Sequence, residues 1–327
     1  MELQQQFTEI TMLIASAKAR AYQAVNKELV TLYWSIGKYV SKQVSEKIWG
    51  KSVVKELANY IQKSEYNIKG FSAQNLWRMK QFYETYETNE KLSTLSRELS
   101  WSHNMEILSN TNSGEEKEFY MMLTLKEKLS FRELQRQINS SYYERVMLAE
   151  TKLSPLVREL PQDITKAFKD TYVFELLQLP EEHQEHDLKK AIARNITKFL
   201  LEFGRDFAFM GEEYPLQVGN QDFAIDLMFY NRSLNCMVAI ELKNERFKPE
   251  HLGQLNFYLE ALDQDVKKAH ENPSIGILLC KGKDDTVVKY ALNRSLSPTL
   301  VADYKTKLPN KALLQQKWEE VLNDLKK

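Results

Sequence analysis

The stretch FAIDLMFYNRSLNCMVAIELK, residues 223–243, contains two mostly apolar halves, and these halves carry three charged side chains, Asp226, Glu241 and Lys243. Two halves rich in Ile, Leu, Met, Phe and Val flank RSLN, residues 232–235, a pattern typical of two strands joined by a short turn. With these four residues as the loop, counting inward places Asp226 directly opposite Glu241. Side chains alternate along a strand, so Lys243 then shares a face with Glu241. A loop one residue longer or shorter would put the two carboxylates on opposite faces.

Facing carboxylates in an apolar hairpin repel each other, and burial makes both ionised forms costly. A divalent cation between them would remove this conflict, and carboxylate oxygens suit Mg²⁺ or Mn²⁺. Beside such an ion, Lys243 can orient or deprotonate a water, or neutralise charge on a phosphate. The pattern therefore predicts metal-assisted phosphodiester hydrolysis, with Asp226 and Glu241 as metal ligands. The alternative is an ordinary ion pair on a solvated face, but the apolar flanks favour burial.

Composition limits the class of protein without naming a partner. The chain has 327 residues, enough for two domains, and its 45 Lys and Arg balance 45 Asp and Glu. Any nucleic-acid footprint must therefore be a local patch. The two cysteines, Cys236 and Cys280, lie in apolar runs, which indicates a reducing, cytoplasmic setting. The N-terminus lacks the pattern of a signal peptide and no stretch is apolar enough for a membrane span, so we expect no membrane association.

The sequence predicts that the first half of the chain is all helical. Residues 1–150 contain no aspartate and no proline, two residues that favour caps and turns over helix interiors. The first expected helix exceeds 40 residues, and we expect it to break near Gly37. Pro155 and Pro161 then mark the domain boundary. The expected helices cover residues 4–46, 52–65, 73–88, 93–109, 115–129 and 131–148.

The second half alternates helical and strand patterns. A helix over 187–203, capped by Gly204, precedes the strands, and a helix over 249–265 follows them. Expected strands cover 206–210, 214–218, 222–230, 236–243 and 274–280. This order describes a compact α/β domain. The predicted organisation is a helical domain over 1–152, a mixed α and β domain over 160–311, and an amphipathic helix over 312–327.

The hairpin IDLMFYNRSLNCMVAIELK resembles the PD-(D/E)XK nuclease superfamily, with Asp226 as its D and Glu241-Leu242-Lys243 as its (D/E)XK. The whole chain resembles the bacterial YhcG-like family of nucleases, in which a helical N-terminal domain precedes a restriction-endonuclease-like core with a mixed sheet flanked by helices. The motifs that carry this likeness are VNKELVTLYWSIGKYV, LSWSH, FRELQRQI, GQLNFYL and SIGILLCK. Ile225 stands where the superfamily has a proline, a common departure. The resemblance implies a metal-dependent nuclease that handles foreign or damaged nucleic acid.

Three further positions are candidates for the catalytic site. The superfamily often adds a carboxylate from the helix before the sheet, and Glu202 fits as a third metal ligand; a solvated surface glutamate is the alternative. The resemblance also suggests that Gln254 and Tyr258, one turn apart, hold the scissile phosphate or a water. Their alternative is ordinary helix surface.

The helical half contains two candidate nucleic-acid surfaces. Gly70 and Ser72 mark a turn and a helix cap in a helix-turn-helix-like segment. Side chains that could then reach bases or phosphates are Gln74, Asn75, Arg78 and Lys80, with Arg132 and Arg136 on a second helix. The alternative is a helical bundle that binds a partner protein, since residues 1–150 are only weakly basic, with 20 Lys and Arg against 18 Glu.

The sequence thus predicts a metal-dependent endonuclease that acts on nucleic acid, DNA more than RNA, with Mg²⁺ or Mn²⁺ as cofactor. The alternative function is a nucleic-acid-binding or scaffold protein with a nuclease-like fold that does not cut. The intact set of Asp226, Glu241 and Lys243 argues against that alternative. A homodimer and a protein partner for the helical domain are both compatible with the resemblance.

Overall fold

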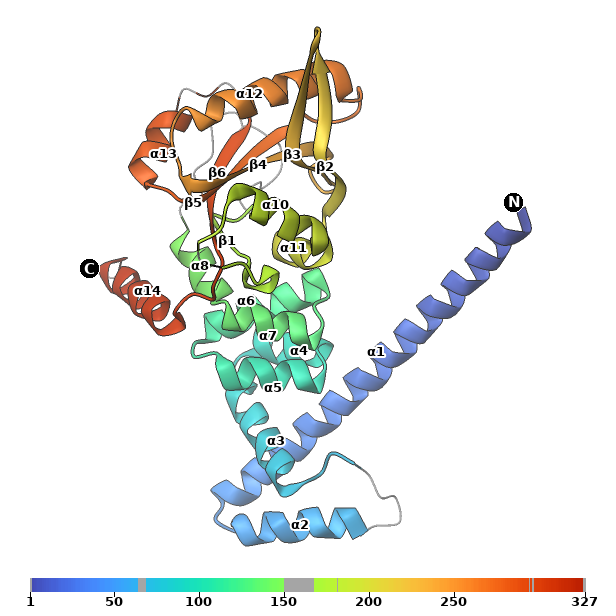
Figure 1. The fold of residues 1–327 in the computed structure, drawn as a ribbon. Helices are drawn as coiled ribbons and strands as arrows, with labels where there is room; N and C mark the ends of the chain where they lie inside the picture. Colours follow the sequence, from blue (N-terminus) through green and yellow to red (C-terminus); the bar gives the residue numbers. More distant parts are fainter. Residues whose placement is uncertain are drawn as a thin grey trace. The chain divides into compact units, whose positions relative to one another are not determined.

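The computed structural model describes residues 2–63, 69–149, 168–180, 182–293, 295 and 297–325. The chain divides into two compact units, Met1–Ile138 and Asn139–Lys327 (Figure 1). The domain boundary predicted at Pro155 and Pro161 lies outside the described residues. Within the described ranges, none of the helices combines the length and hydropathy that a bilayer crossing requires.

The first unit is helical, as the sequence predicts. Its helices are α1 (Glu2–Ser45), α2 (Lys51–Lys63), α3 (Ala73–Tyr86), α4 (Glu90–Glu98), α5 (Trp101–Asn110), α6 (Gly114–Glu127) and α7 (Phe131–Asn139). Polar side chains cap five of them by accepting a hydrogen bond from a backbone N–H three residues on. These caps are Ser72, Asn89, Ser100, Ser113 and Ser130.

Two of the helices predicted in the first half of the chain are each divided in two. The segment expected over 93–109 is interrupted where Leu99 is extended, and the Ser100 hydroxyl caps α5. The segment expected over 131–148 is interrupted at Ser141, whose φ of 52° ends helical geometry before α8 (Tyr142–Leu148). Both interruptions contain serine, whose side chain competes for backbone hydrogen bonds and favours helix caps.

The expected break of the first helix at Gly37 is wrong, because α1 is continuous from Glu2 to Ser45. Gly37 serves close packing instead. A Cβ atom on Gly37 would lie 2.1 Å from the backbone oxygen of Met79 in α3, so glycine lets the two helices approach. Val30, Tyr33 and Val40 are buried on the same side of α1.

The second unit is built on one six-stranded mixed sheet in the order β1-β6-β5-β4-β3-β2. Pairs β1–β6, β6–β5 and β5–β4 are parallel, while β4–β3 and β3–β2 are antiparallel. The strands are β1 (Thr171–Val173), β2 (Phe207–Val218), β3 (Gln221–Asn231), β4 (Cys236–Arg246), β5 (Ile275–Gly282) and β6 (Thr299–Lys305). The helices are α8, α10 (Glu185–Arg194), α11 (Ile196–Phe203), α12 (His251–Ala261), α13 (Asp285–Leu292) and α14 (Lys311–Leu325), with a 3₁₀ turn at Glu175–Leu177 and a π turn at Leu262–Val266.

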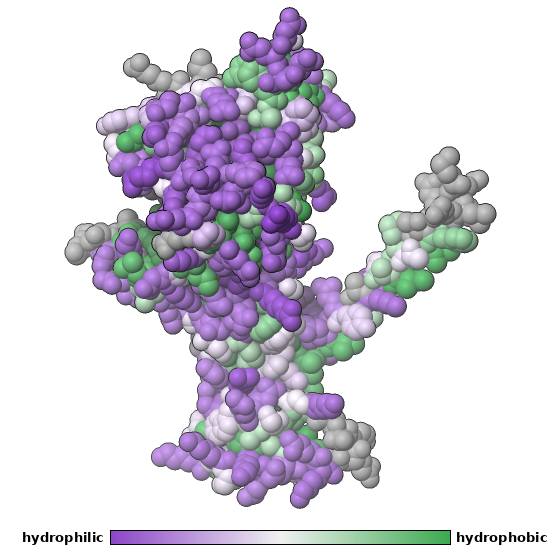
Figure 2. Space-filling model, viewed as in Figure 1, coloured by the Kyte–Doolittle hydropathy of each residue, from purple (hydrophilic) through white to green (hydrophobic). Residues whose placement is uncertain are grey.

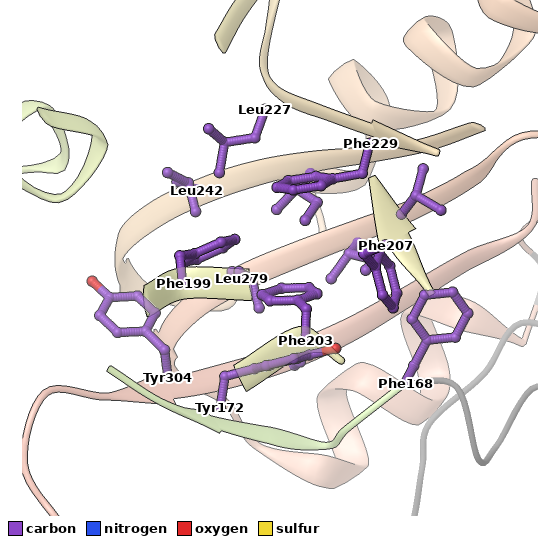
Figure 3. Packing of buried hydrophobic residues seen from close by; sticks show 14 of the residues in the cluster. Phe168, Tyr172, Phe199, Phe203, Phe207, Leu227, Phe229, Leu242, Leu279 and Tyr304 are labelled. Carbon is purple, nitrogen blue, oxygen red and sulfur yellow. The ribbon is translucent and has the colours of Figure 1, made fainter. Parts of the chain in front are cut away.

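Each face of this sheet has its own apolar core. Helices α10 and α11 cover one face, where aromatic rings dominate (Figure 3). Phe203 of α11 and Phe229 of β3 stack there with centroids 6.0 Å apart and an interplanar angle of 4°. Helices α12 and α13 cover the other face with aliphatic side chains. Along β4, Ile240 and Leu242 belong to the first core and Ala239 to the second, which confirms the predicted alternation.

Several predicted boundaries in this unit differ from the structure. The strands expected over 206–210 and 214–218 form the single strand β2, whose pairing with β3 is irregular between Phe209 and Gly211. The helix expected over 187–203 is interrupted at Asn195, while Gly204 does end α11. Strands β1 and β6 were not predicted. Strand β1 has only three residues, and its pairing with the distant β6 defines it as a strand.

The close approach at Gly37 provides a test of the packing in the first unit. We expect Gly37→Ala to destabilise this unit by about 1–3 kcal/mol, because the added methyl meets a backbone oxygen that cannot move aside. Urea unfolding followed by tryptophan fluorescence measures this, since four of the five tryptophans lie in the unit. The control is Gly114→Ala in α6, where nothing lies within 4 Å of the added atom. Equal stability of the two variants would contradict the assigned role.

Candidate active site

The register of the β3–β4 hairpin agrees with the prediction. The backbone pairing starts at Asn231 opposite Cys236 and continues to Leu227 opposite Ile240. The next position along this ladder places Asp226 level with Glu241. RSLN, residues 232–235, is therefore the loop, as the sequence predicts.

At this point the carboxylates take over hydrogen bonding between the two strands. Asp226 Oδ2 accepts a hydrogen bond from the backbone N–H of Leu242, at 2.9 Å. Glu241 Oε1 accepts one from the backbone N–H of Asp226, at 3.4 Å. Asp226 is 5% exposed and Glu241 is 2% exposed, so both carboxylates are buried at the end of the ladder. This geometry orients the two side chains through the opposite backbone.

The pKa of Glu241 reports the electrostatic cost of this arrangement. Burial raises the pKa of the Glu241 carboxyl to about 8, and the negative charge of Asp226 adds to that increase. The positive charges of Lys243 and Lys189 act in the opposite direction. The pair therefore carries more negative charge than its buried surroundings readily accommodate.

Two lysines partly balance that charge. Lys243 Nζ lies 3.7 Å from Glu241 Oε2, as expected for two side chains on one face of β4. Lys189, in α10, forms an ion pair with Asp226 Oδ1, and its pKa is raised by that contact despite partial burial. Lys189 Nζ also lies 3.3 Å from Glu213 Oε1 of β2. Sequence reasoning missed Lys189, because no spacing along the chain relates α10 to β3.

A third carboxylate reaches the same lysines. Glu185 begins α10, one turn before Lys189, with Oε1 3.7 Å from Lys189 Nζ and Oε2 3.9 Å from Lys243 Nζ. An open pocket of about 530 Å³ lies against this group. Its lining is polar and comprises Gln184, Glu185, His186, Lys189, Glu213 and Asn244. The buried carboxylate pair thus adjoins an accessible polar space through Lys189 and Glu185.

Glu202, which the resemblance suggests as a third metal ligand, lies in a different group of charges. It lies in α11, which packs on the sheet face that bears Ile240 and Leu242, whereas Glu241 points to the opposite face. Glu202 Oε1 lies 3.2 Å from both Arg145 Nη1 and Lys169 Nζ, and accepts a hydrogen bond from Val173 N at 3.1 Å. This buried anion ties together α8, α11 and β1. The surface alternative is wrong, since Glu202 is 1% exposed.

Gln254 and Tyr258 lie on α12, which covers the same sheet face as Glu241. Gln254 Nε2 donates to the Tyr258 hydroxyl at 2.7 Å. Tyr258 is buried, and its pKa is raised by burial first and also by the negative charges of Glu241 and Asp226. The structure therefore brings Tyr258 into the electrostatic neighbourhood of the carboxylates and links the exposed Gln254 to it.

The donors present suit a hard divalent cation. Two buried carboxylates supply hard oxygen atoms, and the raised pKa of Glu241 shows that added positive charge would be favourable there. Mg²⁺ typically takes one or two carboxylates and keeps several waters. The described residues hold no cluster of three or more His, Cys, Asp and Glu side chains arranged around one ion, so a two-carboxylate site is the one that fits.

The predicted nucleic-acid residues of the first unit differ in accessibility. On α3, Gln74 and Arg78 are exposed one turn apart, and Arg132 is exposed on α7. Lys80 is half-buried and paired with Glu84 at 2.6 Å. Arg136 is also half-buried, on α7. Gln74, Arg78 and Arg132 are therefore the members of the predicted set with the freest access to a ligand.

Asn75, which the sequence predicts as a residue that could reach nucleic acid, makes hydrogen bonds within the first unit. Its Nδ2 donates to the backbone oxygen of Gly70, and its Oδ1 accepts from Trp101 Nε1 at 3.0 Å. Gly70, with a φ of 99°, forms the turn before α3, as predicted. The Asn75 amide therefore joins this turn to α5.

The raised pKa of Glu241 predicts a pH-dependent stability in EDTA. Because folding raises this pKa from 4.5 to about 8, it favours the protonated carboxyl. That stabilisation is complete below about pH 4.5 and is lost as the pH rises through about 8. We expect Glu241→Gln to raise Tm at pH 9 by roughly 2–4 °C for each kcal/mol recovered, with a smaller difference at pH 5. Glu245→Gln, exposed on the same strand, is the control for thermal scans at both pH values. A difference of the same size at pH 5 and pH 9 would contradict the assignment.

Comparisons with known proteins agree with this architecture. Residues 165–319 match the family model of the YhcG PDDEXK nuclease domain, and residues 9–145 match that of the DUF1016 N-terminal domain. Over 342 aligned residues the chain is 30% identical to "Putative nuclease YhcG" of Escherichia coli (strain K12), covering 93% of this chain and 90% of that protein.

Two solved structures show partial similarity to this chain. A repair endonuclease from Pyrococcus abyssi matches with 19% identity and a TM-score of 0.27, and EndoMS in a complex with dsDNA matches with 18% and 0.28. Each match covers 40% of this chain and 50% of the other. The two family models and the full-length relative establish the identification: this chain belongs to the YhcG family, in which a DUF1016 N-terminal domain precedes a PDDEXK nuclease domain.

Proposed function

We propose that this protein is a metal-dependent endonuclease that hydrolyses phosphodiester bonds of nucleic acid, with DNA as the preferred substrate. The observation that carries this proposal is the buried pair of Asp226 and Glu241, level with each other and flanked by Lys243. PD-(D/E)XK nucleases generally use divalent ions, and the YhcG PDDEXK domain match covers this pair. The preference for DNA rests on the family resemblance and is therefore the part that a substrate panel must decide.

Asp226 and Glu241 would hold a Mg²⁺ or Mn²⁺ ion, which when bound supplies Lewis-acid activation of a water and of a phosphate oxygen. Backbone N–H groups already orient both carboxylates, so little rearrangement is needed to present oxygen atoms to the ion. The Lys243 ammonium, with 18% of its side chain exposed, can neutralise charge on the phosphate or orient the attacking water. Gln254, held by Tyr258, can donate to a phosphate oxygen.

Lys189 and Glu185 extend this proposal to residues that the sequence did not single out. Lys189 places a positive charge on Asp226, where a metal ion would compete with it for the same oxygen. Glu185 lies between Lys189 and Lys243 and places a third carboxylate beside these lysines, where it can support the two metal ligands. If displaced from Asp226, the Lys189 ammonium keeps Glu185 and Glu213 as partners, since both already lie within 4 Å of it.

We expect cleavage of labelled nucleic acid with Mg²⁺ or Mn²⁺ and none in EDTA. Asp226→Asn, Glu241→Gln and Lys243→Met should each lower the rate at least about 100-fold, because each removes a charge that acts directly in the reaction. Lys248→Met is the matched control, since Lys248 is exposed and paired with Glu245. Panels of duplex and single-stranded DNA and RNA define the substrate. Cleavage that survives EDTA or Asp226→Asn contradicts the proposed site, and folded protein that binds but never cuts supports the scaffold alternative.

Calorimetric titration with Mn²⁺ distinguishes the two candidate third carboxylates without relying on activity. Glu185→Gln should weaken Mn²⁺ binding by about 10-fold, in the range seen for groups that support metal ligands. Glu202→Gln should leave Mn²⁺ affinity nearly unchanged and lower Tm, since Glu202 holds Arg145 and Lys169. The reverse pattern would return Glu202 to the metal site.

We further propose that the first unit binds nucleic acid through Gln74, Arg78 and Arg132, which are exposed on α3 and α7. Measured in the Glu241→Gln background, Arg78→Ala with Arg132→Ala should reduce the log–log salt slope by about 1.8 on duplex DNA, about 0.9 for each phosphate that the variant no longer binds. The matched control is Lys91→Ala with Lys126→Ala, whose lysines are already paired with Glu118 and Glu127. Unchanged affinity and slope in the arginine variant would favour protein binding by this unit.

A further inference from the structure

Helix α1 carries a second apolar face in addition to the one buried in the first unit. The buried side contains Val30, Tyr33 and Val40. A separate stripe, spaced by three or four residues, follows the helix on another side, where Figure 2 shows a hydrophobic band along the extended part of α1. This outer stripe consists of Phe7, Ile10, Ile14, Ala17, Ala21, Val25, Leu29, Leu32, Ile36 and Tyr39. Toward its C-terminal end, Ile36 also packs against the core of the first unit and Tyr39 contacts Trp49.

Most of the outer stripe is exposed to solvent. Phe7 is 61% exposed, Ile10 53% and Val25 67%, and Leu32 and Tyr39 are 46% and 57% exposed toward the other end. A contiguous apolar surface of this length on one helix indicates a binding partner. In proteins, most of the stability of a helix comes from the packing of its apolar face rather than from helix propensity. The N-terminal half of α1, which extends beyond the helices that pack on its C-terminal half, is therefore expected to be held by a partner (Figure 1).

The spacing of the stripe is symmetric, as pairing with a second copy of α1 would require. From Phe7 to Tyr39 the intervals are 3, 4, 3, 4, 4, 4, 3, 4 and 3 residues, which read the same in both directions about Gln23. Two copies of α1 running antiparallel, with their twofold axis at the level of Gln23, therefore bring every stripe residue level with another stripe residue. The layers are Phe7 with Tyr39, Ile10 with Ile36, Ile14 with Leu32, Ala17 with Leu29, and Ala21 with Val25. Intervals of three and four are those of packed helical pairs, and this self-complementarity is what a twofold interface requires.

Side-chain size and charge agree with the antiparallel arrangement. Near the axis, small Ala17 and Ala21 meet larger Leu29 and Val25, so the helices can approach without leaving a gap or a clash. Lys18 and Glu28 lie on the same face, and antiparallel pairing places Lys18 of each copy level with Glu28 of the other. Parallel pairing would place Lys18 beside Lys18 and Glu28 beside Glu28, which is unfavourable.

We propose that the outer stripe of α1 is a dimerisation surface that binds a second copy of this chain as an antiparallel helical pair. Residues 7–39 form about 50 Å of helix at ~1.5 Å per residue. The stripe and its flanking positions supply roughly 20 residues a side, within the size of a stable protein interface. The proposal does not depend on the nuclease assignment.

Sedimentation of the full-length protein across a micromolar concentration series tests the surface. We expect the parent to be a dimer and Ile14→Glu with Val25→Glu to weaken the dimer at least about 100-fold, because two buried glutamates per chain lose their hydration. The matched control is Ser16→Glu with Gln23→Glu, which adds the same charge to the same segment on the opposite face of α1. Circular dichroism checks that all variants remain folded. A monomeric parent, or a glutamate variant in the stripe that still dimerises, overturns the proposal.

A charge exchange tests the direction of the two helices. Lys18→Glu alone should weaken the dimer, since it places two glutamates in one layer, and Lys18→Glu with Glu28→Lys should restore it. In a parallel pair, like charges meet like charges in both the parent and the doubly exchanged protein, so no restoration of this kind would occur. A double variant that is as weak as the single variant therefore overturns the antiparallel arrangement. Because the readout is association state, loss of nuclease activity does not affect its interpretation.

Discussion

The hydrogen bonds that Asp226 and Glu241 accept from the opposite strand are the constraint on which the site depends. Up to Leu227 and Ile240 the two strands are joined by their backbones, and at the next position the side chains replace that pairing. This substitution satisfies two buried N–H groups and at the same time fixes the direction of both carboxylates. A register shift by one residue would separate the carboxylates and leave those N–H groups without partners.

Burying two like charges would be unfavourable if positive groups did not come from elsewhere in the unit. Lys243 comes from the same strand, but Lys189 comes from α10, which is held against the sheet by Leu188 and Ile192 in the aromatic core. The two faces of the sheet therefore contribute different residues to the site. The aromatic face holds α10 and α11 and so positions Lys189 and Glu185 at the strand ends. The α12 face presents Glu241, Lys243 and the Gln254–Tyr258 pair.

The buried acids of this unit are compensated in different ways. Glu202 accepts bonds from Arg145, Lys169 and a backbone N–H, a set that satisfies one carboxylate with fixed donors. Asp226 and Glu241 instead share two ammonium groups on long side chains, and the pKa of Glu241 stays raised to about 8. A fully satisfied acid stabilises the fold, whereas an incompletely balanced pair is suited to binding a cation.

The sequence by itself determined the local features of this protein. It predicted the RSLN loop and the hairpin register, because alternation and loop length are properties of adjacent residues. It also predicted the caps at Ser72 and Gly204 and the helical first unit. Packing between distant segments decided the remainder. The sequence predicts a helix break at Gly37, whereas in the structure Met79 packs against this glycine. The resemblance suggests Glu202 as a metal ligand, whereas only the structure shows that Arg145, Lys169 and the Val173 N–H surround it. Lys189 and Glu185 have no sequence spacing that relates them to Asp226, so only the tertiary structure brings these charges together.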